Sequence, residues 1–156
     1  LTVAEAFERH TDLSMAEALA RDRFDETIAL TIEPHLGRER PVFLCDYPLE
    51  CGALAQPKSD APHLVERFEL YIAGLELCNA FGELIDPAEQ RKRFHAERQL
   101  RQTTGKPVAP LPEPFLGALA HMPPASGNAL GMDRLVMLLA DSADIAAVTA
   151  FTPEEL

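Results

Sequence analysis

The stretch that most constrains the fold is residues 69–83, ELYIAGLELCNAFGE. Its alternating aliphatic and aromatic side chains, interrupted at Ala73-Gly74, predict strands near 65–72 and 75–82 joined by a two-residue turn. Four polar side chains interrupt this apolar hairpin, namely Glu69, Glu76, Asn79 and Glu83. Because buried carboxylates are costly without partners, the pattern indicates either a solvated face or a site for positively charged groups.

Strand alternation makes Glu69 and Glu76 diagonal neighbours on one face, about 7–8 Å apart. At about 7 Å two carboxylates repel by roughly 2.4 kcal/mol at an effective dielectric constant of about 20. A divalent cation between them would turn this repulsion into binding, and Mg²⁺ is usually held by one or two carboxylates plus substrate phosphates. The alternative is a solvated hairpin face on which Arg67, Glu69 and Glu76 are ordinary surface charges.

The next polar positions of the second strand have the opposite parity to Glu76. These are the polar residues Asn79 and Glu83, and the apolar Phe81 between them shares their parity. For all of them to line one pocket, the strand needs a β-bulge near Cys78, and we predict one there. Phe81 would then supply an apolar wall, and Glu83 could meet an ammonium group.

A second informative segment is residues 126–139, SGNALGMDRLVMLL. Small residues alternate along its predicted strand, at Gly127, Ala129 and Gly131, and a face without side chains lets a flat group lie on the backbone. Arg134 falls in the first turn of a predicted buried helix over 133–140, where acids are favoured over arginine. It is therefore either a solvated side chain after a glycine-rich turn or a guanidinium that stacks on an aromatic ligand.

The remaining segments predict an α+β fold, an antiparallel sheet flanked by helices. A chain of 156 residues can bury the core of a single domain. Capping signals and apolar spacing predict helices at 2–10, after Ser14, at 22–36, at 86–104 and at 112–122. The run 41–48 predicts a buried strand, and 49–62 a loop.

Composition narrows the class of protein. The net charge of −11 disfavours nonspecific nucleic-acid or membrane binding. The chain opens with a polar mixture, so we expect no secretory leader, and its longest apolar run, 135–140, is too short to cross a membrane. Three cysteines indicate reduced thiols in a cytoplasm, and five scattered histidines do not have zinc-ligand spacing.

Together, VERFELYIAGLELCNAFGELID and ASGNALGMDRLVMLL resemble the end of the catalytic domain of class II aminoacyl-tRNA synthetases of the lysine branch. The second segment is similar to the third class II motif, and the order, the spacing and the intervening DPAEQRKRF agree. Ala129 and the stretch RQTTGKPVAPLPEPFLGAL look more like the elongation factor P (R)-β-lysine ligases, the GenX or PoxA type, than lysyl-tRNA synthetases proper.

The resemblance implies a role for each matching residue. Glu69 and Glu76 match the acids that hold Mg²⁺ and ATP, and Arg134 matches the arginine that stacks on adenine and reaches the phosphates. Asn79, Phe81, Glu83 and Ala129 match the surroundings of the lysine substrate, and Gly131 the floor beneath the substrates. Glu76 and Arg134 are the expected catalytic pair.

Residues 1–156 are therefore expected to be one partial catalytic domain, with a helical segment at 1–40 and the hairpin and third-motif region at 41–156. The first and second class II motifs are not found, so this chain alone is expected to be inactive. The full-length parent is expected to be a cytoplasmic homodimer that attaches lysine or β-lysine to elongation factor P. The alternatives are charging of tRNA-Lys and a non-catalytic interaction module.

Overall fold

The computed structural model describes residues 1–152, and these fall into two compact units. The first unit comprises Leu1–Asp46, Phe68–Ala80 and the residues from Asn128 onward. The second comprises Tyr47–Arg67 and Phe81–Gly127. Compact units of one chain can belong to one catalytic domain, so the expected single domain over 1–156 stays a prediction.

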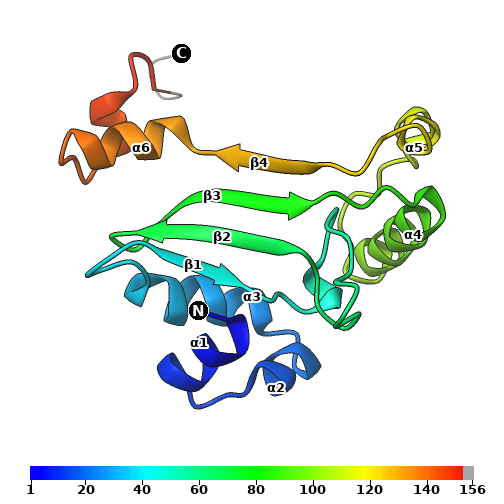
Figure 1. Cartoon of the computed structure of the whole chain (residues 1–156), viewed down its shortest axis with the longest axis horizontal. Coiled ribbons are helices and arrows are strands. Elements are labelled where there is room, and N and C mark those ends of the chain that lie inside the picture. Colours follow the sequence, from blue (N-terminus) through cyan, green and yellow to red (C-terminus); the bar gives the residue numbers. More distant parts are fainter. Residues whose placement is uncertain (153–156) are drawn as a thin grey trace. The chain divides into compact units, whose positions relative to one another are not determined.

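Four antiparallel strands form one sheet in the order β1-β2-β3-β4 (Figure 1). Their bounds are β1 Val42–Cys45, β2 Arg67–Ile72, β3 Leu75–Gly82 and β4 Ser126–Leu130. Between β1 and β2, Val42 lies opposite Tyr71 and Leu44 opposite Glu69. With helices accompanying this sheet, the predicted α+β class is confirmed.

The hairpin turn between β2 and β3 is the predicted one. Ala73 and Gly74 have φ angles of 54° and 80°, the left-handed pair typical of a two-residue primed turn. Their backbone amides donate to Gly37 O at 2.8 Å and Leu36 O at 2.9 Å. The turn is thus fixed to the segment that ends the N-terminal helices.

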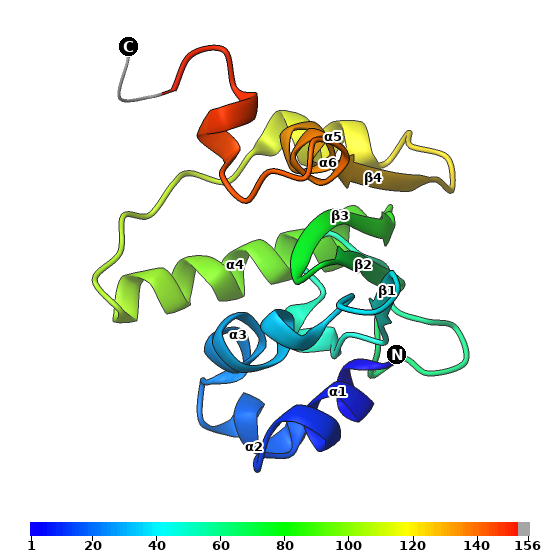
Figure 2. The same cartoon turned by 90° about the vertical axis from the view of Figure 1, so that its left-hand side faces the viewer.

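Three helical segments of the first unit gather beside β1 (Figure 2). Capping boxes begin α1 (Val3–His10) at Thr2 and α2 (Met15–Ala20) at Ser14, as the sequence predicts. Their buried apolar side chains include Phe7, which stacks on Phe24 with ring centroids 5.5 Å apart.

The predicted helix over 22–36 is present but changes its hydrogen-bonding pattern along its length. It starts as α3 (Phe24–Thr27), continues as a π-helix (Ile28–Ile32) and ends as a 3₁₀-helix (Glu33–His35). Pro34 cannot donate a backbone hydrogen bond, which accounts for the altered last turn. Gly37 follows at φ 68°.

Two expectations about burial are wrong. In β1 only Leu44 is buried, and Phe43 is 54% exposed, because successive side chains of a strand point to opposite faces of the sheet. In α6 (Met132–Leu139) only Met137 is buried, and Leu139 is 81% exposed. An eight-residue helix that turns one stripe toward its neighbours leaves its other apolar side chains outside.

The second unit contains α4 (Pro87–Thr103) and α5 (Glu113–Leu119). The Asp86 carboxylate caps α4 by accepting from the amide of Ala88 at 2.8 Å. Of the residues of α4, only Gln90 is buried, in agreement with a solvated outer helix. None of the helices in residues 1–152 is long and apolar enough to cross a membrane.

Candidate functional site

The carboxylate of Glu69 lies at the centre of a hydrogen-bonded group in the first unit. Glu69 is only 6% exposed on β2. Tyr71 donates its hydroxyl to Glu69 Oε2 at 2.7 Å, and Asn79 donates Nδ2 to Glu69 Oε1 at 2.9 Å. Both oxygens therefore accept a hydrogen bond, which fixes the orientation of the carboxylate. Glu69 is not an ordinary surface charge.

The contact between Glu69 and Asn79 bears on the predicted bulge. A two-residue turn places Glu69 opposite Cys78, so plain alternation would send Asn79 to the other face. The hydrogen bond instead puts Asn79 on the face of Glu69, and Leu77 and Cys78 are buried in succession. This change of parity is what an extra residue in β3 produces.

Glu33 is a member of this group that the sequence analysis missed. Its Oε1 lies 3.1 Å from the Tyr71 hydroxyl oxygen. Burial raises the pKa of Glu33, and the nearby charges of Glu69 and Glu76 raise it further, against the lowering effects of Tyr71 and Arg134. No sequence pattern identifies Glu33 as a site residue. It follows the apolar stripe of a helix, where a solvent-exposed acid is equally common.

The hydroxyl of Tyr71 has one proton for two carboxyl neighbours. The shorter distance, 2.7 Å, assigns that proton to Glu69. Glu33 Oε1, at 3.1 Å, is a second acceptor within reach of the same hydroxyl.

Arg134 joins the small-residue segment to the hairpin within the first unit. Its Nη1 donates to Glu76 O at 2.6 Å and lies 3.6 Å from Glu76 Oε2. The amide of Gly131 donates to Leu77 O at 2.8 Å, which holds the start of α6 against β3. The side chains of Arg134 and Glu76 are 47% and 31% exposed, so both remain accessible to a ligand.

The two glycines of this segment differ in what surrounds them. A Cβ on Gly131 would meet Arg134 Cδ at 3.4 Å, an ordinary contact, so a small side chain there would lie against the arginine without a clash. In the second unit a Cβ on Gly127 would overlap the Glu83 carboxylate. Gly127 therefore allows Glu83 to lie directly against β4. Ala129, between them in sequence, is exposed.

The predicted lysine-binding residues are divided between the two units. Asn79, Ala129 and Gly131 belong to the first unit, and Phe81 and Glu83 to the second. The Glu83 amide donates to Ala125 O at 3.0 Å. The Phe81 ring centroid lies 5.6 Å from the guanidinium carbon of Arg67. The structure thus brings together Glu33, Glu69, Tyr71, Glu76, Asn79 and Arg134, and it places Phe81 with Arg67 and Glu83 with Gly127.

The carboxylates of Glu69 and Glu76 are the candidate ligands for Mg²⁺. Hard carboxylate oxygens suit this cation. Among residues 1–152 no group of three or more histidine, cysteine, aspartate or glutamate side chains forms a metal cluster. The donor type therefore fits Mg²⁺, with further oxygens to come from water or phosphate.

Comparisons with known proteins give one consistent result. The family of class II tRNA synthetases (D, K and N) matches residues 2–155. A lysine–tRNA ligase of Anaeromyxobacter sp. (strain K) is 44% identical over 140 residues, 86% of this chain and 27% of that protein. An elongation factor P–(R)-β-lysine ligase of Edwardsiella ictaluri (strain 93-146) is 46% identical over 125 residues, 80% of this chain and 38% of that protein.

A second ligase with the latter name, from Hamiltonella defensa, is 42% identical over 136 residues, 86% of this chain and 42% of that protein. The chain thus spans well under half the length of these three relatives. The resemblance found in the hairpin and the small-residue segment is confirmed. The chain belongs to the family of class II tRNA synthetases (D, K and N).

Proposed function

We propose that the polypeptide containing this chain activates lysine or (R)-β-lysine with ATP and transfers it to a lysine of elongation factor P. The observation that carries the proposal is the meeting of Arg134 with Glu76 beside the buried Glu69 group. It places a permanent positive charge next to ordered carboxylates, as a site for a metal-bound nucleotide needs. The names of two of the relatives support the amino acid and the acceptor.

The proposed chemistry is attack of the amino-acid carboxylate on the α-phosphate of ATP. An aminoacyl-adenylate forms, and pyrophosphate leaves. Arg134 would stack on adenine and bind phosphate, while Glu69 and Glu76 would hold Mg²⁺, which neutralises phosphate charge when bound. The residues act by positioning and charge rather than by covalent catalysis.

The amine end of the substrate would be recognised by a second set of residues. Asn79, Phe81 and Glu83 would surround the substrate, with the Glu83 carboxylate pairing with its side-chain ammonium. Ala129 would limit the space beside the substrate, and Gly131 would form the floor. One methyl group discriminates between substrates by only about 1–3 kcal/mol, so Ala129 tunes the choice of lysine isomer rather than fixing it.

A second candidate function is charging of tRNA-Lys. The 44% identity to a lysine–tRNA ligase supports it directly. Both functions share the adenylate step and differ in the acceptor. A third possibility, a non-catalytic interaction module, is disfavoured because Glu69, Glu76, Glu83 and Arg134 are all present, and a module without catalysis could lose them. A cytoplasmic homodimer is the proposed state of the full-length protein.

The test uses the full-length polypeptide that contains this chain. Amino-acid-dependent exchange of pyrophosphate into ATP, measured with α-lysine and with (R)-β-lysine, reports the adenylate step. Transfer of the labelled amino acid to elongation factor P or to tRNA then identifies the acceptor. We expect exchange with a lysine isomer and transfer to elongation factor P. Exchange with neither isomer would contradict the proposal, and transfer to tRNA alone would establish the second candidate.

A further inference from the structure

The side chain of Arg67, at the start of β2, lies against two aromatic rings of the second unit. Its guanidinium carbon is 4.2 Å from the centroid of the Tyr47 ring and 5.6 Å from the centroid of the Phe81 ring. Both distances are within the range of cation–π contacts. Arg67 is half-buried rather than fully solvated, so it is not an ordinary surface charge.

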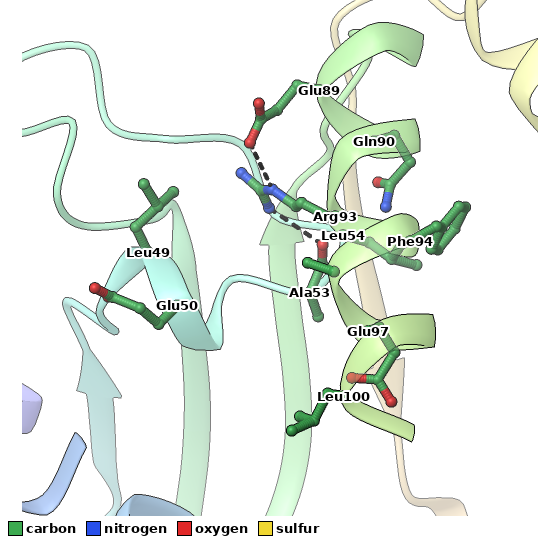
Figure 3. Close-up of a pocket in the computed structure, with 11 residues that line it drawn as sticks. Leu49, Glu50, Ala53, Leu54, Glu89, Gln90, Arg93, Phe94, Glu97 and Leu100 are labelled. Carbon is green, nitrogen blue, oxygen red and sulfur yellow. Dashed lines mark hydrogen bonds and ion pairs between the residues drawn. The ribbon is translucent and has the colours of Figure 1, made fainter. Parts of the chain in front are cut away.

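A hydrogen bond to the loop that follows β1 fixes the guanidinium. Arg67 Nη1 donates to Cys51 O at 2.8 Å. The same loop is tied to helix α4, because Arg93 donates to Ala53 O at 3.1 Å and to Ala55 O at 2.8 Å (Figure 3). The arginine of β2 is thus held by a backbone carbonyl in a segment that is itself anchored.

The two aromatic partners of Arg67 differ in how tightly they are confined. Tyr47 is only 2% exposed, and its backbone oxygen accepts from the amide of Val65 at 3.0 Å. Phe81 is half-buried, so its ring is less confined by the rest of the unit. The buried tyrosine therefore locates the guanidinium, and the guanidinium in turn restricts the ring of Phe81.

The change of parity in β3 explains why Phe81 meets Arg67. An unbroken ladder from the two-residue turn would place Ala80 opposite Arg67. The amide of Gly82 instead donates to Glu66 O at 2.8 Å, a shift in register that places Phe81 opposite Arg67. The contact between the ring and the guanidinium agrees with this register. The bulge therefore sets this ring against a fixed positive group.

The charge of Arg67 limits what it can do for the substrate. Two positive charges repel, so Arg67 does not suit a direct contact with the ammonium group of lysine, whose proposed partner is Glu83. It can instead keep an aromatic wall in one orientation. A binding pocket depends on such supporting residues, because a wall that moves loses part of its contact with the ligand.

We propose that Arg67 is a positioning residue for the amine end of the substrate, because it holds the Phe81 ring as a wall of the lysine-binding pocket. This inference rests on the proposed function, in which Phe81 is that wall. The competing explanation is that Arg67 only joins β2 to the loop through Cys51 O. The first role affects the binding of lysine through Phe81, whereas the second affects only the amount of folded protein.

The test is pyrophosphate exchange by the full-length polypeptide with the lysine isomer that it uses. Arg67→Met keeps an unbranched side chain but removes the planar cation. We expect it to raise the KM for lysine about tenfold or more, while kcat and the KM for ATP change less than about threefold. Arg67→Lys, which keeps the charge without the planar group, should give an intermediate KM for lysine. Arg91→Met is the matched control and should leave both KM values unchanged, because Arg91 pairs with Glu113 instead.

A cycle with Phe81→Leu tests whether Arg67 acts through the ring. In a Phe81→Leu background, Arg67→Met should raise the KM for lysine less than about twofold, because the wall that it holds is already gone. Equal rises in the two backgrounds would overturn the positioning role, as would equal rises in the KM values for lysine and ATP. An unchanged KM for lysine, with or without a fall in kcat from lost folded protein, would also overturn it. Absence of exchange by the parent with either isomer would refute the proposed function itself, and this role with it.

Discussion

Buried polar atoms have hydrogen-bond partners in the group around Glu69, whereas one lacks a partner in the group around Gln90. Glu69, 6% exposed, accepts hydrogen bonds at both oxygens, from Tyr71 and Asn79. Gln90, 1% exposed, leaves Oε1 without a partner. The first region orders a carboxylate by means of the chain itself, and the second leaves a buried polar atom without a hydrogen-bond partner. The comparison predicts that substitutions in the two regions have unequal costs.

The largest effect is expected for Arg134 in the full-length polypeptide. Arg134→Gln removes the positive charge held against Glu76 and should lower amino-acid-dependent pyrophosphate exchange by roughly 100-fold or more. Arg91→Gln is the matched control, because Arg91 pairs with Glu113 on the outer helices of the second unit. Similar losses in both variants would mean that the effect is structural and that Arg134 has no special role.

The next largest effect is the loss of stability on removing the Tyr71 hydroxyl, which donates a hydrogen bond to buried Glu69. Tyr71→Phe leaves Glu69 Oε2 and Glu33 Oε1 without the hydroxyl, and should lower the free energy of unfolding by about 1–3 kcal/mol. Urea unfolding at neutral pH measures it. In a Glu33→Gln background, Tyr71→Phe should lower the free energy of unfolding by almost the same amount as in the parent. The reason is that the shorter hydrogen bond of the hydroxyl goes to Glu69. An unchanged unfolding midpoint would show that the hydroxyl is not needed there.

What the sequence predicts well is local. The turn at Ala73-Gly74, the capping boxes at Thr2 and Ser14 and the Asp86 cap all follow from side chains within a few residues of one another. Such signals act through backbone angles and first-turn hydrogen bonds, so they need no knowledge of the rest of the fold. The bulge predicted near Cys78 used only strand parity and the spacing of polar residues, and the contact between Asn79 and Glu69 agrees with it.

What the sequence could not predict depends on contacts between distant segments. Glu33 reaches Tyr71 across 38 positions, and nothing near Pro34 distinguishes its carboxylate from a solvated one. Burial of α6 was overestimated because a run of apolar residues does not say which of its faces has a neighbour. Gln90 looked like one polar residue among many on an outer helix, and only its neighbours in space show that it is buried.

The pH dependence of stability tests the group around Glu69, through its member Glu33. The pKa of Glu33 is raised in the folded state by burial and by Glu69 and Glu76. The protein is therefore most stable, as far as this group is concerned, below the ordinary glutamate pKa, and it loses stability as pH rises through the raised value. The glutamine of Glu33→Gln cannot ionise. The free energy of unfolding of this variant should therefore increase relative to that of the parent as pH rises above about 4.5. A difference independent of pH would contradict the assignment.

The smallest effect is expected at Gln90, and it is the sharpest test of the comparison. Gln90→Leu deletes a buried acceptor that has no partner and replaces it with a side chain of similar size, so the lost hydrogen bonding is small and apolar burial increases. The free energy of unfolding should stay within about 0.5 kcal/mol of the parent or rise. Urea unfolding of Gln90→Leu and Tyr71→Phe under the same conditions gives the contrast directly. Equal destabilisation of the two variants would mean that Gln90 Oε1 is satisfied in solution, most simply by bound water, and the distinction between the two regions would fail.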